Sequence, residues 1–319
     1  MSNLPPIPAP PTSLAEASTS LQALWDYMQP AFDHIFRSPT SDPAKVPPID
    51  AAYYIWVSTA LYNYRTSPRR PASLNENARM RMPGSDVYER VDAYLASIAQ
   101  ELMSGAPQDA HALIPYLLST YTRFTTSAAV LHRMLNYINS HFVTPELNRG
   151  HGWLGRHEIP DQNPKKPRRG GNWREGVKAR FAELRAAELK KWGWEEGDPA
   201  DVLAEAQTCA EAASGLDRVV PLASLARRRF RTEVLEPLLK VPGAGAGMEQ
   251  SGNGRLDNAV AELLDLTTTQ SLGERAQLAQ IMARMLRMCG MQPDHPLRRR
   301  LDSDGYTGMS PKRYPTVSC

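Results

Sequence analysis

The chain is poor in cysteine and has no long apolar run, and both absences exclude whole classes of protein. Its three cysteines, Cys209, Cys289 and Cys319, lie far apart with no CxxC pair, so we expect neither a disulfide framework nor a cysteine zinc site. No run of about 18 apolar residues is present to span a membrane. The N-terminus lacks the charge and apolar segment of a secretory signal. These features favour an intracellular protein of the cytoplasm or nucleus.

Signatures of catalysis are also missing. The seven histidines show no HExxH or other metal-ligand spacing, and no cysteine or acidic cluster lies beside His151 and His157 in their glycine-rich stretch. The GAGAG run at 243–247 lacks the Lys-Ser/Thr that completes a phosphate loop. A formal net charge of +3 is too small to indicate nucleic-acid binding by the whole chain. We expect no metal, no cofactor and no enzymatic activity.

No segment alternates apolar and polar residues in the way that a strand requires, so an all-α fold is predicted. Asp50 and Asp109 are suited to cap helices, Ser13 or Ser18 could begin the first helix, and Pro30 should kink or interrupt it. We expect a disordered proline-rich tail over 1–13, a helical domain over 14–291 with an insertion at 150–220, and a loose tail over 292–319. Helical patterns cover 21–35, 51–65, 87–102, 111–118, 121–143, 202–213, 222–239, 256–266 and 273–288.

Residues 121–143 are the most informative segment because they predict one long helix with two apolar stripes. The first stripe is typical of a helix that faces a core, and the second runs beside it at steps of three and four residues. A helix with this much apolar circumference either lies inside the fold or offers one face to a partner. The first stripe comprises Phe124, Leu131, Leu135, Ile138 and Phe142, and the second comprises Val130, Met134, Tyr137 and His141.

The end of this segment, VLxxxLNYINSHFV, resembles the signature helix of the first cullin repeat. Three further segments fit that family in the same order. These are LWDYMQPAFDHIF in the first helix, LYNYRTS at 61–67, and SLARRRFRTEVLEPLL at 224–239 followed by GRLDNAVAELL and QLAQIMARMLRMCGM. The resemblance covers residues 20–143 and 222–291, and the insertion has no counterpart in it.

The resemblance implies a cullin-repeat-like bundle of about five main helices, acting as a non-catalytic scaffold. Its implied partner is a Skp/BTB-type substrate adaptor, in ubiquitin-dependent protein catabolism. Nothing in the chain resembles the cullin region that holds the RING protein, so no RING protein is expected on this chain alone. The chain would then compete with full cullins, serve a separate assembly, or represent a truncated cullin.

In the cullins, the second and fifth helices hold the adaptor, and here they correspond to 50–65 and 121–143. Ser58 stands where the family often has a large aromatic residue. The alternative interpretation is that these aromatic residues fill the bundle core. The candidate contacts are Tyr54, Ile55, Ser58, Leu61 and Tyr62 on the second helix, and the less buried positions Arg123, Ser127, Val130 and Met134 on the fifth.

A second hypothesis is a helical module that binds nucleic acid through a basic segment. Residues 164–191 hold ten basic residues against three acidic ones, and Trp173 could stack on a base. The simpler interpretation is a solvated insertion with a charged helix. The candidate residues are Lys165, Lys166, Arg168, Arg169, Trp173 and Arg174, and Arg227, Arg228, Arg229 and Arg231 could extend their surface.

Overall fold

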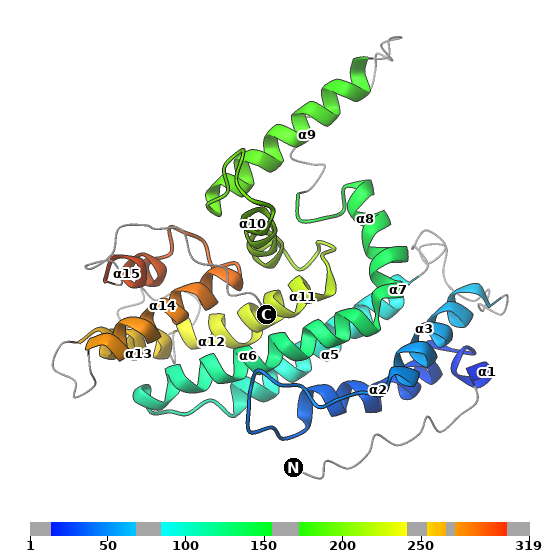
Figure 1. The fold of residues 1–319 in the computed structure, drawn as a ribbon, viewed down its shortest axis with the longest axis horizontal. Coiled ribbons are helices and arrows are strands. Elements are labelled where there is room, and N and C mark those ends of the chain that lie inside the picture. The colour runs from blue at the N-terminus through cyan, green and yellow to red at the C-terminus, as the bar shows by residue number, and fades with distance from the viewer. Residues whose placement is uncertain (1–13, 68–83, 155–171, 241–253, 266–271, 305–319) are drawn as a thin grey trace, which may run out of the picture.

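The chain is folded as helices wherever the structure describes it, and the described residues contain no strand. The computed structural model describes residues 14–67, 84–154, 172–240, 254–265 and 272–304 (Figure 1). Over these residues the predicted all-α class is confirmed. The elements are α1 (Leu14–Ala17), α2 (Leu21–Arg37), α3 (Ala51–Thr66), α5 (Ser85–Ser104), α6 (Ala110–Met134), α7 (Asn136–Ile138), η1 (Asn139–Val143), α8 (Thr144–Arg149), α9 (Asn172–Lys191), α10 (Ala200–Ala213), α11 (Leu222–Phe230), η3 (Arg231–Leu235), α12 (Glu236–Leu239), α13 (Arg255–Leu264), α14 (Leu272–Met288) and α15 (Pro296–Asp304).

Side-chain caps fix where the first long helices begin. Asp50 accepts a hydrogen bond of 3.0 Å from a backbone N–H in the first turn of α3, and Asp109 does the same for α6 at 3.0 Å. Both predicted caps are therefore confirmed. Helix α2 is capped by Ser20, at 3.1 Å, and not by Ser13 or Ser18. The short helix α1 lies before this cap.

Two prolines lie inside helices without ending them. Helix α2 continues through Pro30, so the predicted interruption there is wrong, and α6 continues through Pro115. The segment 111–118, which the sequence predicts either to lead into or to precede the long helix, leads into it, and together with 121–134 it forms one helix of 25 residues. Buried side chains on both sides of Pro30, such as Met28 and Phe32, hold α2 against the core, and this packing offsets the lost backbone hydrogen bond.

The predicted single helix over 121–143 is wrong at its C-terminal end. Helix α6 ends at Met134, Leu135 leaves helical geometry at φ −96° and ψ 25°, and the path resumes as α7 and the π-helical η1. Asn139 holds the break by donating from Nδ2 to the His132 carbonyl at 3.2 Å and accepting from the backbone N–H of Leu222 at 3.4 Å. An asparagine side chain that bonds backbone groups competes with regular helix in this way.

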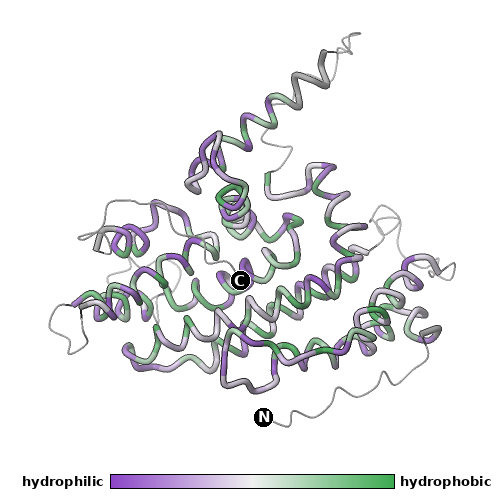
Figure 2. The backbone as a smooth tube through the Cα atoms, viewed as in Figure 1, coloured by the Kyte–Doolittle hydropathy of each residue, from purple (hydrophilic) through white to green (hydrophobic). Residues whose placement is uncertain are grey.

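The main core forms where α2, α5, α6 and α11 meet. Aromatic rings connect these helices. Trp25 and Tyr94 lie edge to face with centroids 5.6 Å apart, as do Phe36 and Phe124 at 5.6 Å, and Phe124 and Phe230 lie tilted at 5.8 Å. Figure 2 shows hydrophobic and hydrophilic residues alternating along the central helices, as expected where each helix buries one side. Helices α13 and α14 pack against the N-terminal part of α6 (Figure 1).

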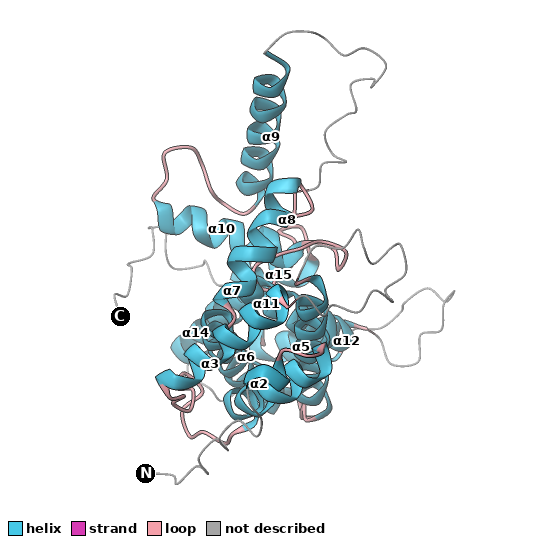
Figure 3. Ribbon diagram, turned by 90° about the vertical axis from the view of Figure 1, so that its right-hand side faces the viewer, coloured by secondary structure: helices cyan, strands magenta, loops and turns pink. Residues whose placement is uncertain are grey.

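Most of the described part of the region predicted as an insertion folds as two helices, of which α10 packs on this core. Helix α9 projects away from the body, and α10 lies between it and α11 and α14 (Figures 1 and 3). The buried Trp192 joins residues of α9 and α10 in a second apolar cluster. Arg228 of α11 is fully buried and donates to the carbonyls of Gly215 at 2.7 Å and Arg218 at 2.8 Å, which ties the end of the region to the core.

The C-terminal helices follow the predicted pattern with one correction. The segment 222–239 is helical throughout, through α11, η3 and α12, and α13 and α14 lie where expected. The loose tail predicted from residue 292 is wrong for 296–304, which form α15. Leu297 and Leu301, one turn apart, bury that helix against α13 and α14. Residues 1–13, predicted to be a disordered tail, lie outside the described part of the chain.

Candidate partner-binding surface

Helix α3 presents two large apolar side chains to solvent. Ile55 is 65% exposed and Tyr62 is 53% exposed, and their spacing of seven residues places them on one side of the helix. Tyr54 and Ser58 lie half-buried beside them. Leu61 is 1% exposed and belongs to the core, so a partner has no access to this predicted contact residue. The outer side of α3 is thus apolar around Ile55 and Tyr62.

The contacts predicted on the fifth helix are mostly inside the molecule. Ser127, Val130 and Met134 are buried and Arg123 is half-buried, so the expectation that these positions are less buried is wrong. The reason is the approach of α2. Carbonyl groups at its C-terminal end and in the following loop accept hydrogen bonds from Arg123 and Ser127, and Val130 and Met134 belong to the main core.

Arg123 and Ser127 complete the C-terminal end of α2. The Ile35 carbonyl accepts from Arg123 Nη2 at 2.6 Å and from Ser127 Oγ at 3.1 Å, and Arg123 Nη1 donates to the Lys45 carbonyl at 2.8 Å. The last carbonyls of a helix have no partner within it, and a cation there also offsets the helix dipole. Both side chains therefore support the fold that holds α3.

In place of those residues, the structure brings α7 and η1 beside α3. The rings of Tyr62 and Tyr137 lie 6.2 Å apart edge to face, and His141 stacks on Tyr137 at 4.2 Å. Arg65 donates from Nη1 to the Tyr137 hydroxyl at 3.1 Å, with its guanidinium 5.7 Å from the ring centroid. We call Ile55, Tyr62, Arg65, Tyr137 and His141 the α3–α7 face.

The sequence contained a signal for part of this face. Tyr137 and His141 belong to the second stripe of 121–143, at a spacing of four residues. The other half of that stripe, Val130 and Met134, turns inward because the helix breaks at Leu135. Arg65 gives no such signal, since a single arginine near the end of a helix is common.

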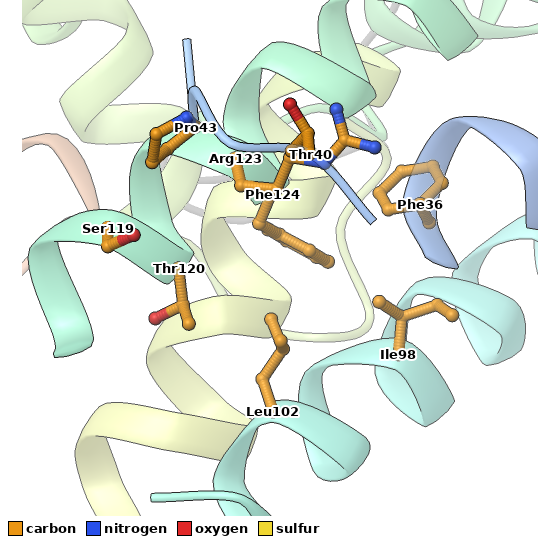
Figure 4. Close-up of a pocket in the computed structure, with 9 residues that line it drawn as sticks. All are labelled: Phe36, Thr40, Pro43, Ile98, Leu102, Ser119, Thr120, Arg123 and Phe124. Atoms are coloured by element: carbon orange, nitrogen blue, oxygen red, sulfur yellow. The ribbon is translucent and has the colours of Figure 1, made fainter. Parts of the chain in front are cut away.

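A small cavity lies between α2, α5 and α6, beneath the loop that follows α2. Its volume is about 150 Å³, below the roughly 300–1,000 Å³ typical of ligand pockets. Figure 4 shows Ile98 and Leu102 of α5 turned toward Phe124 of α6, with Thr40 and Arg123 on the opposite side. This volume is too small for a typical cofactor.

The arginines of α11 give little support to the hypothesis of nucleic-acid binding through a basic segment. Lys165, Lys166, Arg168 and Arg169 lie outside the described residues, as do the side chains of Trp173 and Arg174. Arg228 is fully buried, and Arg229 forms a two-bond ion pair with Asp92, at 2.6 and 2.5 Å, and a further pair with Glu233 at 3.1 Å. Arg228 and Arg229 therefore interact within the protein and do not extend a basic surface.

Metal and membrane features were searched over the same described residues. No group of three or more histidine, cysteine, aspartate or glutamate side chains there is placed to hold a metal ion. Nδ1 of His151 lies within hydrogen-bonding distance of Glu146 Oε2, at 2.6 Å, and His157 lies outside the described residues. None of the described helices combines the length and apolarity needed to cross a bilayer.

The chain is thus an all-α protein with an apolar ridge on α3 that is exposed to solvent. Part of the chain is similar to a yeast cullin, Cell division control protein 53 of Saccharomyces cerevisiae, with 24% identical residues over 142 residues. The similarity covers 42% of this chain and 17% of the relative, so the chain spans less than a fifth of the relative's length. No family model matches the chain, and no solved structure matches it. The similarity points to a distant relation to the cullins, which are scaffolds and not catalysts.

Proposed function

We propose that this protein is a non-catalytic, cullin-like scaffold that binds a Skp/BTB-type adaptor in ubiquitin-dependent protein turnover, in the cytoplasm or nucleus. The observation that carries the proposal is the exposure of Ile55 and Tyr62 together on α3. Large apolar side chains at one exposed site are typical of protein-binding surfaces. The partial similarity to a yeast cullin supports the choice of partner.

The α3–α7 face offers a partner an apolar ridge beside an aromatic stack. Fully burying an isoleucine side chain contributes about 1.5–3 kcal/mol, and a buried tyrosine at an interface commonly costs about 2 kcal/mol or more when cut to alanine. Tyr62 is already oriented by Tyr137, so little side-chain freedom is lost when a partner docks on it. Leu61, Val130 and Met134 act from inside by holding the ridge in place.

The test is binding of purified Skp-type and BTB-type adaptors to the intact chain. We expect Tyr62→Ala to weaken binding by roughly 30-fold, the equivalent of about 2 kcal/mol, and Ile55→Asp to abolish it. Both side chains are exposed, so thermal unfolding should change little. The matched control is Ile281→Asp on α14, where another large apolar side chain is 45% exposed outside this face. Failure of the wild type to bind any adaptor, or equal loss in the control, would refute the proposal.

A further inference from the structure

The elements of the α3–α7 face contain no acidic residue. Neither residues 51–66 nor residues 110–145 include an aspartate or glutamate, although the chain has 34 acidic residues among 319. By proportion these two segments would carry about five. The basic residues of these two segments are Arg65, His111, Arg123, His132, Arg133 and His141.

Four described carboxylates lie close to these segments in sequence and interact within the chain, among them Asp109, which caps α6, while Glu76 lies outside the described residues. Asp50 caps α3, Asp86 accepts a hydrogen bond of 2.5 Å from the Tyr64 hydroxyl, and Glu146 pairs with Arg149 at 3.2 Å. Each of them has a partner within the chain, and none forms an ion pair with Arg65 or Arg133.

Two arginines on the helices that lead into this face, Arg65 of α3 and Arg133 of α6, form no ion pair with any carboxylate that the structure describes. Among the described residues, Arg65 makes its hydrogen bond and its cation–π contact with Tyr137, through the hydroxyl and the ring. Arg133 is exposed in the last turn of α6, one turn before Tyr137, and forms no ion pair with any described carboxylate. The face thus combines exposed apolar groups with uncompensated positive charge.

We infer that the partner segment that docks on this face is an acidic amphipathic helix. Ile55 and Tyr62 are separated by two helical turns, about 10 Å, which matches apolar residues at i, i+3 or i+4, and i+7 of a partner helix. Glutamates or aspartates flanking that stripe meet Arg65 and Arg133. Complementary charge of this kind accelerates association and fixes the register of docking. The inference deepens the proposed function and rests on it for the identity of the surface.

Two synthetic probes test the charge preference directly on the intact chain. Both are helical peptides of about 18 residues with the same leucine stripe, one with glutamates and one with lysines on its flanks. Fluorescence anisotropy should show the glutamate peptide binding at least about tenfold more tightly at low salt, with the difference shrinking as salt screens the charges. Equal affinities, a preference for lysine, or no binding of either peptide overturns the inference.

Reversing the charge of a single arginine then shows which residue causes the preference for the glutamate peptide. Arg133→Glu should remove the advantage of the glutamate peptide, whereas Arg299→Glu, at an exposed position of α15, should leave it unchanged. An unchanged preference in Arg133→Glu also overturns the inference. The adaptor experiment remains separate: an adaptor that binds through Tyr62 with no effect of Arg133→Glu or of salt leaves the scaffold function standing and refutes the acidic helix.

Discussion

At the scale of single residues, Glu211 is an acidic group that the fold encloses. Its side chain is 3% exposed, accepting from Ser224 Oγ at 2.5 Å and from Gln207 Nε2 at 2.9 Å. Burial raises the pKa of this carboxyl, and the two hydrogen bonds oppose the rise without cancelling it. The folded protein therefore holds a proton on Glu211 more strongly than the unfolded chain does.

This difference predicts how stability depends on pH. Because the folded pKa of Glu211 lies above its unfolded value, its contribution to the free energy of unfolding falls as pH rises from about 4.3 through the folded pKa. Between the two pKa values the loss is about 1.4 kcal/mol per pH unit. Urea unfolding across this range should give a flatter profile for Glu211→Gln, which can keep both hydrogen bonds. Glu183→Gln, at a side chain 70% exposed, should follow the wild type, and an unchanged profile in Glu211→Gln would contradict the prediction.

Residue roles were predictable where they depend on near neighbours in sequence. Asp50 and Asp109 were recognised as caps because the N–H groups that they bind lie two and three residues away. Ser127 was misplaced because its partner, the Ile35 carbonyl, lies 92 residues away. Leu61 and Tyr62 are adjacent on one helix, and the positions of the helices packed against α3 decide which of the two is covered.

At the scale of elements, the break after α6 determines the direction in which Tyr137 and His141 point on the α3–α7 face. Without it, Tyr137 and His141 would continue the stripe of Val130 and Met134, which lies inside. Asn139 secures the break through the carbonyl of His132 and the N–H of Leu222, in a nearly buried position. The face therefore depends on one amide side chain that does not belong to it.

Replacing that amide should loosen the segment. Asn139→Ala leaves a buried backbone N–H and a carbonyl without partners, which costs about 1–3 kcal/mol. We expect faster amide hydrogen exchange over 136–143 and weaker adaptor binding, with exchange in α5 little changed. Asn136→Ala, at an exposed position three residues earlier, is the control. Unaltered exchange over 136–143 in Asn139→Ala would show that the break is held by other contacts.

The sequence could not reveal this break or the last helix. Its apolar pattern continues from Leu131 to Phe142 without proline or glycine, and Asn139 binds a helix 83 residues further on. Helix α15 was missed because its sequence, PLRRRLDSD, offers only Leu297 and Leu301 to a core. In both cases tertiary contacts decided what a weak or misleading local pattern left open.

At the scale of the whole molecule, the α9–α10 region is joined to the core through close contact at Gly290. This residue ends α14 at φ +79°, and a Cβ placed on it would lie 2.2 Å from the backbone nitrogen of Ala213 at the end of α10. Near it, Cys209 of α10 lies 3.9 Å from the sulfur of Met288. The two apolar clusters meet at this point.

Gly290→Ala should therefore disturb the join between the clusters. The added methyl group is strained by the positive φ and collides with backbone that cannot yield easily, and we expect a loss of about 2–3 kcal/mol in the free energy of unfolding. Gly273→Ala on the same helix has no atom within 4 Å of the new Cβ and should be neutral or stabilising by up to about 1 kcal/mol. Thermal and urea unfolding measure both, and equal effects would contradict the assignment.

Because Leu61 is buried and the adjacent Tyr62 is exposed, α3 couples partner binding to the stability of the whole chain. The inner side of α3 is part of the core and contacts α1, α2, α6 and α7, while its outer side is open to a partner. Any molecule that binds only the folded form raises its stability by mass action, by about 2.7 kcal/mol at a concentration 100 times its Kd. Occupancy of α3 would thus make the stability of the whole chain depend on the concentration of its partner.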